Sequence, residues 1–113
     1  MHEVSIMTEA VRLAVAAAQA AGARQITGLR LRVGTLSGAA PEALTFAWDI
    51  VRRDTLAERA QLEIETIPAT GWCATCRAEF AAADFLGECP RCHEPGGQLQ
   101  HGRELEIAAV DFI

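Results

Sequence analysis

The sequence predicts an α+β fold in which two helices pack on a small three-stranded antiparallel sheet, with a cysteine-bearing module inserted before the last strand. Helical and alternating apolar periodicities occupy separate segments, which is typical of this class. All four cysteines fall between residues 73 and 92. The length of 113 residues indicates one domain with a small satellite.

Two segments have the features of amphipathic helices. Residues 5–21 are predicted as the first helix, with Ser5 as its N-cap and Gly22 as the left-handed residue that ends it. Pro41 suits the first turn of the second helix, because that position does not need the N–H that proline lacks. The second helix then carries an apolar stripe at helical spacing, formed by Leu44, Ala47, Trp48 and Val51.

Three segments alternate apolar and polar residues and are predicted as strands: 26–33, 62–67 and 103–112. The polar face of the first strand carries Arg30 and Arg32. The polar faces of the other two carry glutamates, namely Glu63, Glu65, Glu104 and Glu106. Because opposite charges on neighbouring strands attract, we expect the arginine strand to lie between the two glutamate strands. A change of phase near Ala108 and Ala109 predicts a bulge in the last strand.

Composition and charge exclude several classes of protein. Half of the residues are apolar and 22% are charged, which excludes a disordered chain. No apolar run reaches the roughly 18 residues that cross a bilayer. The net charge of −5 argues against a nucleic-acid-binding protein. The N-terminus lacks the basic region of a signal peptide, so we expect a cytoplasmic protein whose cysteines stay reduced.

The four cysteines form two C-x2-C pairs, Cys73 with Cys76 and Cys89 with Cys92, separated by twelve residues. Each pair can direct two thiolates at one ion, and two pairs complete a tetrahedral four-sulfur site. Zinc is the preferred ion, and we expect it to be structural because a closed four-sulfur site has no open coordination position. An iron site of the rubredoxin type and a redox-active dithiol are the alternatives.

The segment around this site, residues 69–101, has too few apolar residues for a core of its own, so we expect a zinc-ribbon-like domain held together by its metal. Residues 1–68 and 102–113 are expected to form one discontinuous α/β domain. His93 directly follows the last cysteine, and His101 lies eight residues further on. These histidines are either solvated side chains or ligands that exchange with a cysteine in an altered state of the site.

The N-terminal sequence Met1-His2-Glu3 is a second candidate metal site. A free terminal amine, the His2 imidazole and the intervening backbone amides can chelate one divalent ion, and such nitrogen donors suit Ni²⁺ and Cu²⁺. A histidine near a terminus is also commonly a solvated side chain, and the motif alone does not decide between the two interpretations.

The whole chain resembles the HypA family, which are nickel metallochaperones for the maturation of nickel–iron hydrogenases. The resemblance is carried by Met1-His2-Glu3, by the alanine-rich first helix, by Gly34-x-Leu36-Ser37-Gly38-x-x-Pro41-Glu42-x-Leu44-x-Phe46, and by the motifs C-x2-C and C-P-x-C-H. It follows the chain in order and in length. It implies a nickel domain of two helices and a three-stranded sheet, with a zinc domain inserted before the last strand.

The resemblance also implies roles for individual residues. His2 is the implied essential nickel ligand, together with the amine of Met1 and the backbone nitrogens of His2 and Glu3. Glu3 is further implied in docking the enzyme precursor. The four cysteines map onto the zinc ligands of the family.

The implied function is that of a metallochaperone and not of an enzyme, with Ni²⁺ as cargo and Zn²⁺ as structural cofactor. The implied partners are the accessory GTPase of the pathway and the hydrogenase large-subunit precursor, with neither nucleic acid nor membrane, and a homodimer is compatible with the family. The alternatives from other classes are a zinc-ribbon interaction module of transcription or translation and a rubredoxin-like electron carrier.

Overall fold

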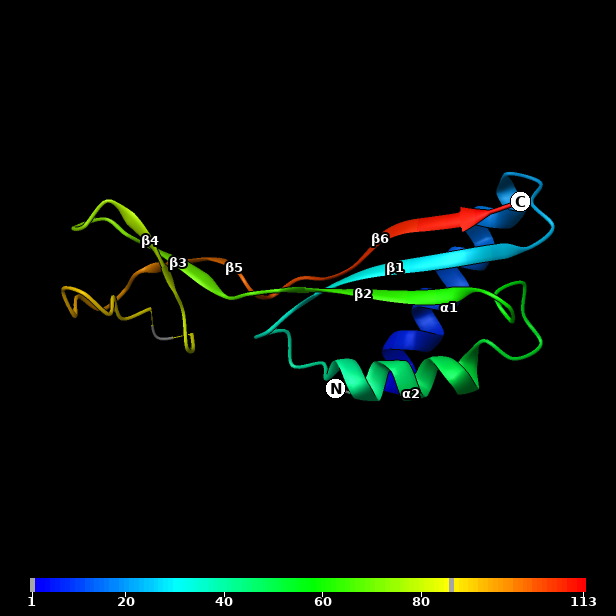
Figure 1. The fold of residues 1–113 in the computed structure, drawn as a ribbon, viewed down its shortest axis with the longest axis horizontal. Coiled ribbons are helices and arrows are strands. Elements are labelled where there is room, and N and C mark those ends of the chain that lie inside the picture. Colours follow the sequence, from blue (N-terminus) through cyan, green and yellow to red (C-terminus); the bar gives the residue numbers. More distant parts are fainter. Residues whose placement is uncertain (1, 86) are drawn as a thin grey trace.

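The computed structural model of the chain describes residues 2–85 and 87–113. The molecule is elongated, with extents of 54 × 25 × 16 Å, and its two small sheets lie at opposite ends (Figure 1). The elements are α1 (Glu3–Ala20), β1 (Ile26–Gly34), α2 (Pro41–Val51), β2 (Gln61–Ile67), β3 (Thr70–Cys73), β4 (Ala78–Ala81), β5 (Gln98–His101) and β6 (Leu105–Phe112). Among the described residues, no helix combines the length and apolar character that crossing a membrane requires.

The larger sheet has the strand order β2-β1-β6, so the arginine-bearing strand is central, as predicted. The combination of two helices with a three-stranded sheet is likewise confirmed. We expected an antiparallel sheet, and β1 and β6 do run antiparallel. The prediction is wrong for β1 and β2, which run parallel. The cause is the connection between β1 and β2. The helix α2 lies within it and returns the chain to the starting end of the sheet, as parallel neighbours require.

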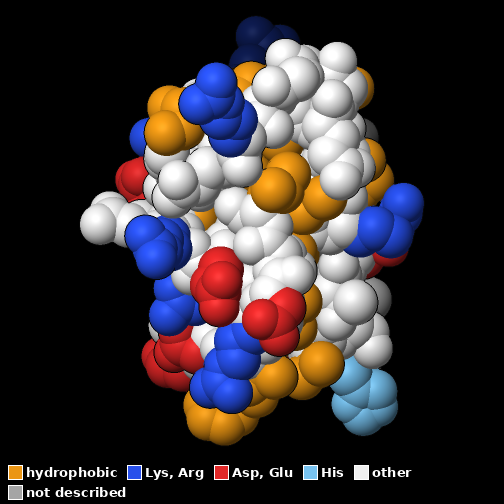
Figure 2. All heavy atoms as spheres, turned by 90° about the vertical axis from the view of Figure 1, so that its right-hand side faces the viewer, with side chains coloured by type: hydrophobic (Ala, Val, Ile, Leu, Met, Phe, Trp, Pro, Cys, Tyr) orange, Lys and Arg blue, Asp and Glu red, His pale blue; other side chains and the backbone are white. Residues whose placement is uncertain are grey.

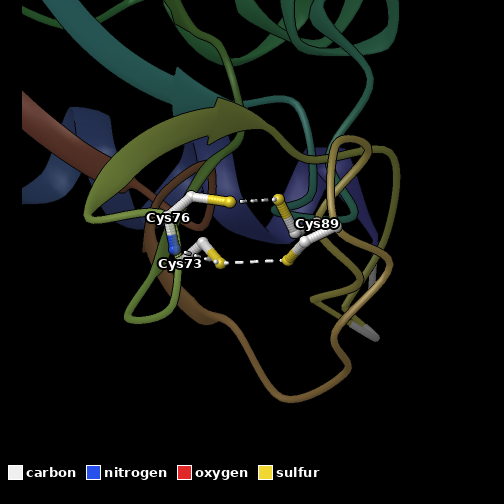
Figure 3. A group of neighbouring side chains, drawn as sticks. Cys73, Cys76 and Cys89 are labelled. Carbon is white, nitrogen blue, oxygen red and sulfur yellow. Dashed lines mark hydrogen bonds between the residues drawn. The ribbon is translucent and has the colours of Figure 1, made fainter.

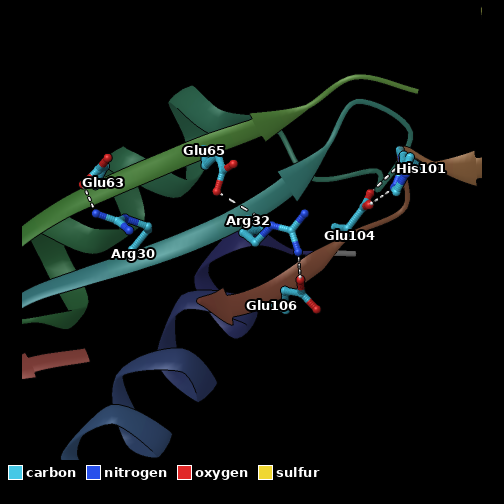
Figure 4. Close-up of polar contacts among 8 residues, drawn as sticks. Arg30, Arg32, Glu63, Glu65, His101, Glu104 and Glu106 are labelled. Carbon is cyan, nitrogen blue, oxygen red and sulfur yellow. Dashed lines mark hydrogen bonds and ion pairs between the residues drawn. The ribbon is translucent and has the colours of Figure 1, made fainter. Parts of the chain in front are cut away.

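The charges that predicted the strand order form ion pairs on the open face of this sheet (Figure 4). Arg30 Nη2 lies 3.3 Å from Glu63 Oε2. Arg32 lies between two acids, with Nη1 2.7 Å from Glu106 Oε1 and Nε 3.7 Å from Glu65 Oε2. These side chains are exposed, so each pair contributes at most about 1 kcal/mol and acts mainly on strand order and register.

Glu104 departs from this prediction. It lies just before β6, where its carboxylate accepts a hydrogen bond from the backbone N–H of Gly102 (2.6 Å) and lies 3.3 Å from Nδ1 of His101. Strand β6 begins at Leu105 rather than at residue 103, which explains why Glu104 does not join the ladder. The predicted bulge is confirmed, since the register of β1 with β6 shifts where Ala108 is passed over.

Both helices contribute to one core with the larger sheet. Its buried residues include Met7, Ala14, Ile26, Leu31, Leu44 and Trp48. Helix α1 ends at Ala20, and Gly22 just beyond it has the predicted left-handed conformation (φ +71°). The helix begins at Glu3 with His2 as its N-cap, so the prediction of Ser5 as the cap is wrong. Seen from the end opposite the smaller sheet, apolar side chains are also exposed among acidic and basic ones (Figure 2).

The smaller sheet, with the order β4-β3-β5, is formed by chain between β2 and β6. Where it joins the larger sheet, backbone segments meet closely. The N–H of Gly34 donates to the Glu104 carbonyl and that of Leu36 to the Gly102 carbonyl, both at 2.7 Å. A Cβ on Gly34 would lie 2.1 Å from the carbonyl oxygen of Gly102, so this crossing requires glycine. The other connection between the sheets runs from β2 to β3, and it is held to the same loop because the N–H of Ala69 donates to Oγ1 of Thr35 (3.1 Å).

Candidate metal centres

The four predicted cysteine ligands converge at the far end of the smaller sheet (Figure 3). Cys73 ends β3 and Cys76 lies in the turn to β4, whereas Cys89 and Cys92 lie between β4 and β5. All four sulfurs lie within 4.8 Å of one another, with Sγ–Sγ distances of 3.6 Å for Cys73–Cys92 and 3.9 Å for Cys76–Cys89. A tetrahedron with zinc–sulfur bonds of ~2.3 Å has sulfur–sulfur edges of about 3.8 Å. The cluster therefore fits a single tetrahedral ion.

Both C-x2-C turns are closed by local hydrogen bonds. In the first, the N–H of Cys76 donates to Sγ of Cys73 (3.4 Å), and in the second the N–H of His93 donates to the Cys89 carbonyl (2.8 Å). The residue after each second cysteine, Arg77 or His93, has a left-handed backbone, with φ of 52° and 61°. This conformation is unfavourable for residues other than glycine, so other contacts must hold Arg77 and His93 in it.

The electrostatics of the cluster favour a cation. Backbone N–H groups of Cys92 and Arg91 point at the Cys89 sulfur and lower its pKa to about 6. Hydrogen bonds with Cys92 and then Cys73 raise the pKa of Cys76 to about 12. Four sulfurs at these distances can all be thiolates only when a positive ion balances them. An all-sulfur tetrahedral donor set suits zinc and leaves no coordination position open for a substrate.

Little else holds this end of the molecule together. Its buried cluster consists of Cys73, Phe80 and Cys89, among the described residues. The Phe80 ring lies against Gly71 and Gly97, where added Cβ atoms would come within 2.5 and 2.8 Å of it. So small an apolar cluster cannot offset the entropy of ordering three strands, and a metal ion held by the four cysteines would supply the missing stabilisation.

The N-terminal candidate lies on α1, apart from the cysteines. His2 is exposed, and its imidazole makes no capping hydrogen bond. Its carbonyl accepts the first helical hydrogen bond from Ile6 (3.2 Å). Met1, whose amine the resemblance implies as a nickel ligand, lies outside the described residues.

Glu3 has a contact that sequence reasoning missed. Its carboxylate accepts a hydrogen bond from the backbone N–H of Ala40 (3.2 Å), the N-cap residue of α2. This bond lowers the pKa of Glu3, and a weaker contribution in the same direction comes from the backbone N–H of Glu3 itself. The carboxylate therefore ties the first turn of α1 to the start of α2. No local pattern could have indicated it, because the two residues are 37 positions apart.

Neither candidate histidine joins the cysteine cluster in the described part of the chain. Nδ1 of His93 lies 3.2 Å from Glu88 Oε1, and Nδ1 of His101 lies 3.3 Å from Glu104 Oε2. Both imidazoles are largely exposed. His101 instead lies at the junction of the two sheets, beside the carboxylate that orders the turn at Gly102.

Comparison with known proteins identifies the family. The family model for HypA, described as hydrogenase/urease nickel incorporation and metallochaperone, matches residues 1–112. Two relatives are each described as hydrogenase maturation factor HypA. The one from Picosynechococcus sp. is 47% identical and covers 100% of both chains, and the one from Chloroflexus aggregans is 42% identical and covers 98% of both.

Solved structures support the same fold. The solution structure of the Ni metallochaperone HypA from Helicobacter pylori has a TM-score of 0.70 and 22% sequence identity, and the match covers 100% of this chain and 98% of that one. A second solution structure of a HypA protein has a TM-score of 0.73, also at 22% identity. Taken with the full-length family match, these findings show that the chain belongs to the HypA family of hydrogenase/urease nickel-incorporation metallochaperones.

Proposed function

We propose that this protein binds Ni²⁺ at its N-terminus and delivers it for the maturation of a nickel–iron hydrogenase. Family membership is the observation that carries the proposal. The proposed ligands are the His2 imidazole, the amine of Met1 and the backbone nitrogens of His2 and Glu3.

The start of α1 has chemistry suited to this role. The first four N–H groups of a helix have no intrahelical acceptor, so deprotonating them breaks no helical hydrogen bond. Together with an exposed imidazole, such amides supply the nitrogen donors that Ni²⁺ favours. An exposed site also suits a protein that must release its cargo. Binding requires loss of protons from the donors, so nickel affinity should fall as the pH is lowered.

The cysteine cluster is proposed to bind Zn²⁺ and to act structurally. We propose that residues 69–101 form this zinc domain and that residues 1–68 and 102–113 form the nickel domain. Neither site is proposed to catalyse a reaction. The accessory GTPase of the pathway and the hydrogenase large-subunit precursor are the proposed partners, and the cytoplasm is the proposed compartment.

A nickel titration tests this function. Untagged protein, so that the amine of Met1 stays free, is compared with His2→Ala, and the zinc content of both is measured. We expect about one Ni²⁺ per chain for the wild type, strong loss of nickel binding in the variant, and equal zinc in both. Equal nickel binding by the variant would refute the N-terminal site and favour a zinc-ribbon interaction module.

A further inference from the structure

The four cysteine sulfurs are not equally shielded. Cys73 and Cys89 are buried, whereas Cys76 and Cys92 are half-buried. Backbone N–H groups point at three of the sulfurs: that of Cys76 at Cys73 (3.4 Å), those of Arg91 and Cys92 at Cys89, and that of Glu94 at Cys92. Within residues 2–85 and 87–113, the Cys76 sulfur has no such donor. It is therefore both accessible and unshielded by the backbone.

The close contacts between sulfurs cross from one C-x2-C turn to the other. Sγ of Cys76 lies 3.9 Å from Sγ of Cys89, and Sγ of Cys73 lies 3.6 Å from Sγ of Cys92. Each contact joins an accessible sulfur to a buried one. A movement of about 2 Å within either pair brings its sulfurs to the separation of a disulfide bond.

We propose that Cys76 is a site of oxidation by peroxide, that Cys89 resolves it as a disulfide, and that this reaction releases the metal and disorders the smaller sheet. A bound cation keeps the sulfurs as thiolates, which is the form that peroxides oxidise. The Cys76 sulfur takes one oxygen of hydrogen peroxide as the O–O bond breaks. The departing hydroxide takes up a proton to form water, and Cys76 becomes a sulfenic acid.

The Cys89 thiolate then completes the reaction. It attacks the Cys76 sulfur, so that the sulfur–sulfur bond forms as the sulfur–oxygen bond breaks, and the hydroxide leaves as water after taking up a second proton. In total, two thiolates, one hydrogen peroxide and two protons give one disulfide and two waters. Cys73 and Cys92 alone cannot complete a tetrahedral site. Because the smaller sheet has little other core, losing the ion removes its main support.

The spacing of arginines allows the disulfide to be assigned by peptide mapping. Trypsin cleavage after Arg59, Arg77, Arg91 and Arg103 gives peptide 60–77 with Cys73 and Cys76, peptide 78–91 with Cys89, and peptide 92–103 with Cys92. The proposed disulfide joins peptides 60–77 and 78–91. A disulfide within the first turn leaves peptide 60–77 unlinked, and one within the second turn joins peptides 78–91 and 92–103.

Peroxide treatment of the reduced, untagged protein tests the inference, which goes beyond nickel delivery and rests on the proposed zinc. At about one equivalent of hydrogen peroxide, we expect loss of most of the bound zinc, a 60–77/78–91 product that fragmentation assigns to Cys76 and Cys89, and recovery of zinc binding after thiol reduction. Disulfides confined to single turns, or zinc retained in a roughly tenfold excess of peroxide, would overturn the inference. Reduced protein that contains no zinc would instead refute the zinc proposal itself.

Two variants, compared at equal zinc content, test the resolving role of Cys89. Cys89→His removes the resolving thiol and still offers zinc a nitrogen ligand. With dimedone present to trap sulfenic acids, the adduct on Cys76 should increase at least about fivefold. Cys92→His is the matched control, since it changes the other cysteine of the same turn, and it should keep the 60–77/78–91 link. An equal yield of adduct in the two variants would exclude Cys89 as the resolving residue.

Discussion

Replacing Gly34 with alanine should damage the junction between the two sheets. The added Cβ would lie 2.1 Å from the carbonyl oxygen and 2.2 Å from the carbonyl carbon of Gly102, and 2.7 Å from the backbone nitrogen of Arg103. All three neighbours are backbone atoms, so no side-chain rotation can relieve the overlap. Ordinary contact begins at 3.4 Å, and the two segments must therefore separate by more than an ångström.

The magnitude follows from that separation. Overpacking of this kind costs about 1–3 kcal/mol. The same movement weakens two backbone hydrogen bonds, from Gly34 to Glu104 and from Leu36 to Gly102, each worth about 1 kcal/mol. We therefore expect Gly34→Ala to lower the free energy of unfolding by about 3 kcal/mol, which corresponds to a fall in Tm of roughly 10–15 °C.

Urea unfolding followed by far-UV circular dichroism measures the change, with zinc content determined on the same samples. Gly22→Ala is the matched control, because Gly22 is left-handed (φ +71°) and has no heavy atom within 4 Å of its added Cβ, so it reports only a backbone cost of about 1 kcal/mol. Zinc content should stay at the wild-type value. A loss for Gly34→Ala no larger than for Gly22→Ala would refute the reasoning.

Three further perturbations test other contacts. Chelating the metal should disorder β3, β4 and β5 while the helical circular dichroism signal remains, and acid should do the same because zinc binds thiolates. Glu104→Gln should cost about 1 kcal/mol at pH 7. The pKa of Glu104 is lowered, first by its own backbone N–H and that of Gly102, and then by His101. The stabilisation that the Glu104 carboxylate gives to the fold is therefore complete above about pH 4.3, the ordinary pKa of glutamate, and is lost as the pH falls through the folded-state pKa. Glu3→Ala should speed amide hydrogen exchange at Ala40, and Glu3→Gln should retain part of the protection.

Each of these perturbations has a control. Glu79→Gln changes an exposed glutamate of β4 and should leave stability at pH 7 unchanged, whereas an equal effect would show that Glu104 acts through net charge. Glu42→Ala removes another exposed acid near the start of α2 and should not change exchange at Ala40. If chelating the metal also removed the helical circular dichroism signal, the smaller sheet would not unfold independently of the helices, which would contradict the first of these predictions.

The features that the sequence predicted correctly rest on repeated local patterns. Arg30 and Arg32 alternate with apolar residues, and the glutamates of the neighbouring strands do the same, so only one strand order pairs the charges. The spacing within each C-x2-C motif places two sulfurs on one turn, which is why the cluster could be foreseen from residue positions alone.

The features that were missed depend on contacts between distant segments. The direction of β2 is set by the path of α2, which alternation of residues does not encode. Ser5 has the chemistry of an N-cap, but the helix starts earlier, at Glu3, whose carboxylate is bonded to Ala40. Glu104 has the phase of a ladder residue, yet the junction at Gly102 recruits it as a hydrogen-bond acceptor. In each case tertiary packing overrides a local preference.

The loop at residues 34–40 connects these distant contacts. At one end Gly34 and Leu36 are bonded to the chain that leaves the smaller sheet, and at the other Ala40 is bonded to Glu3, next to His2. The loop is also braced internally, because the N–H of Ser37 donates to the Gly34 carbonyl (3.0 Å) and its Oγ accepts from Ala39 (3.2 Å). A continuous series of hydrogen bonds and backbone therefore runs from the cysteine-bearing sheet to the proposed nickel terminus. If that route is stiff, Gly34→Ala should speed exchange at Ala40 as well as at the junction. Exchange confined to the junction would show instead that the loop absorbs the displacement.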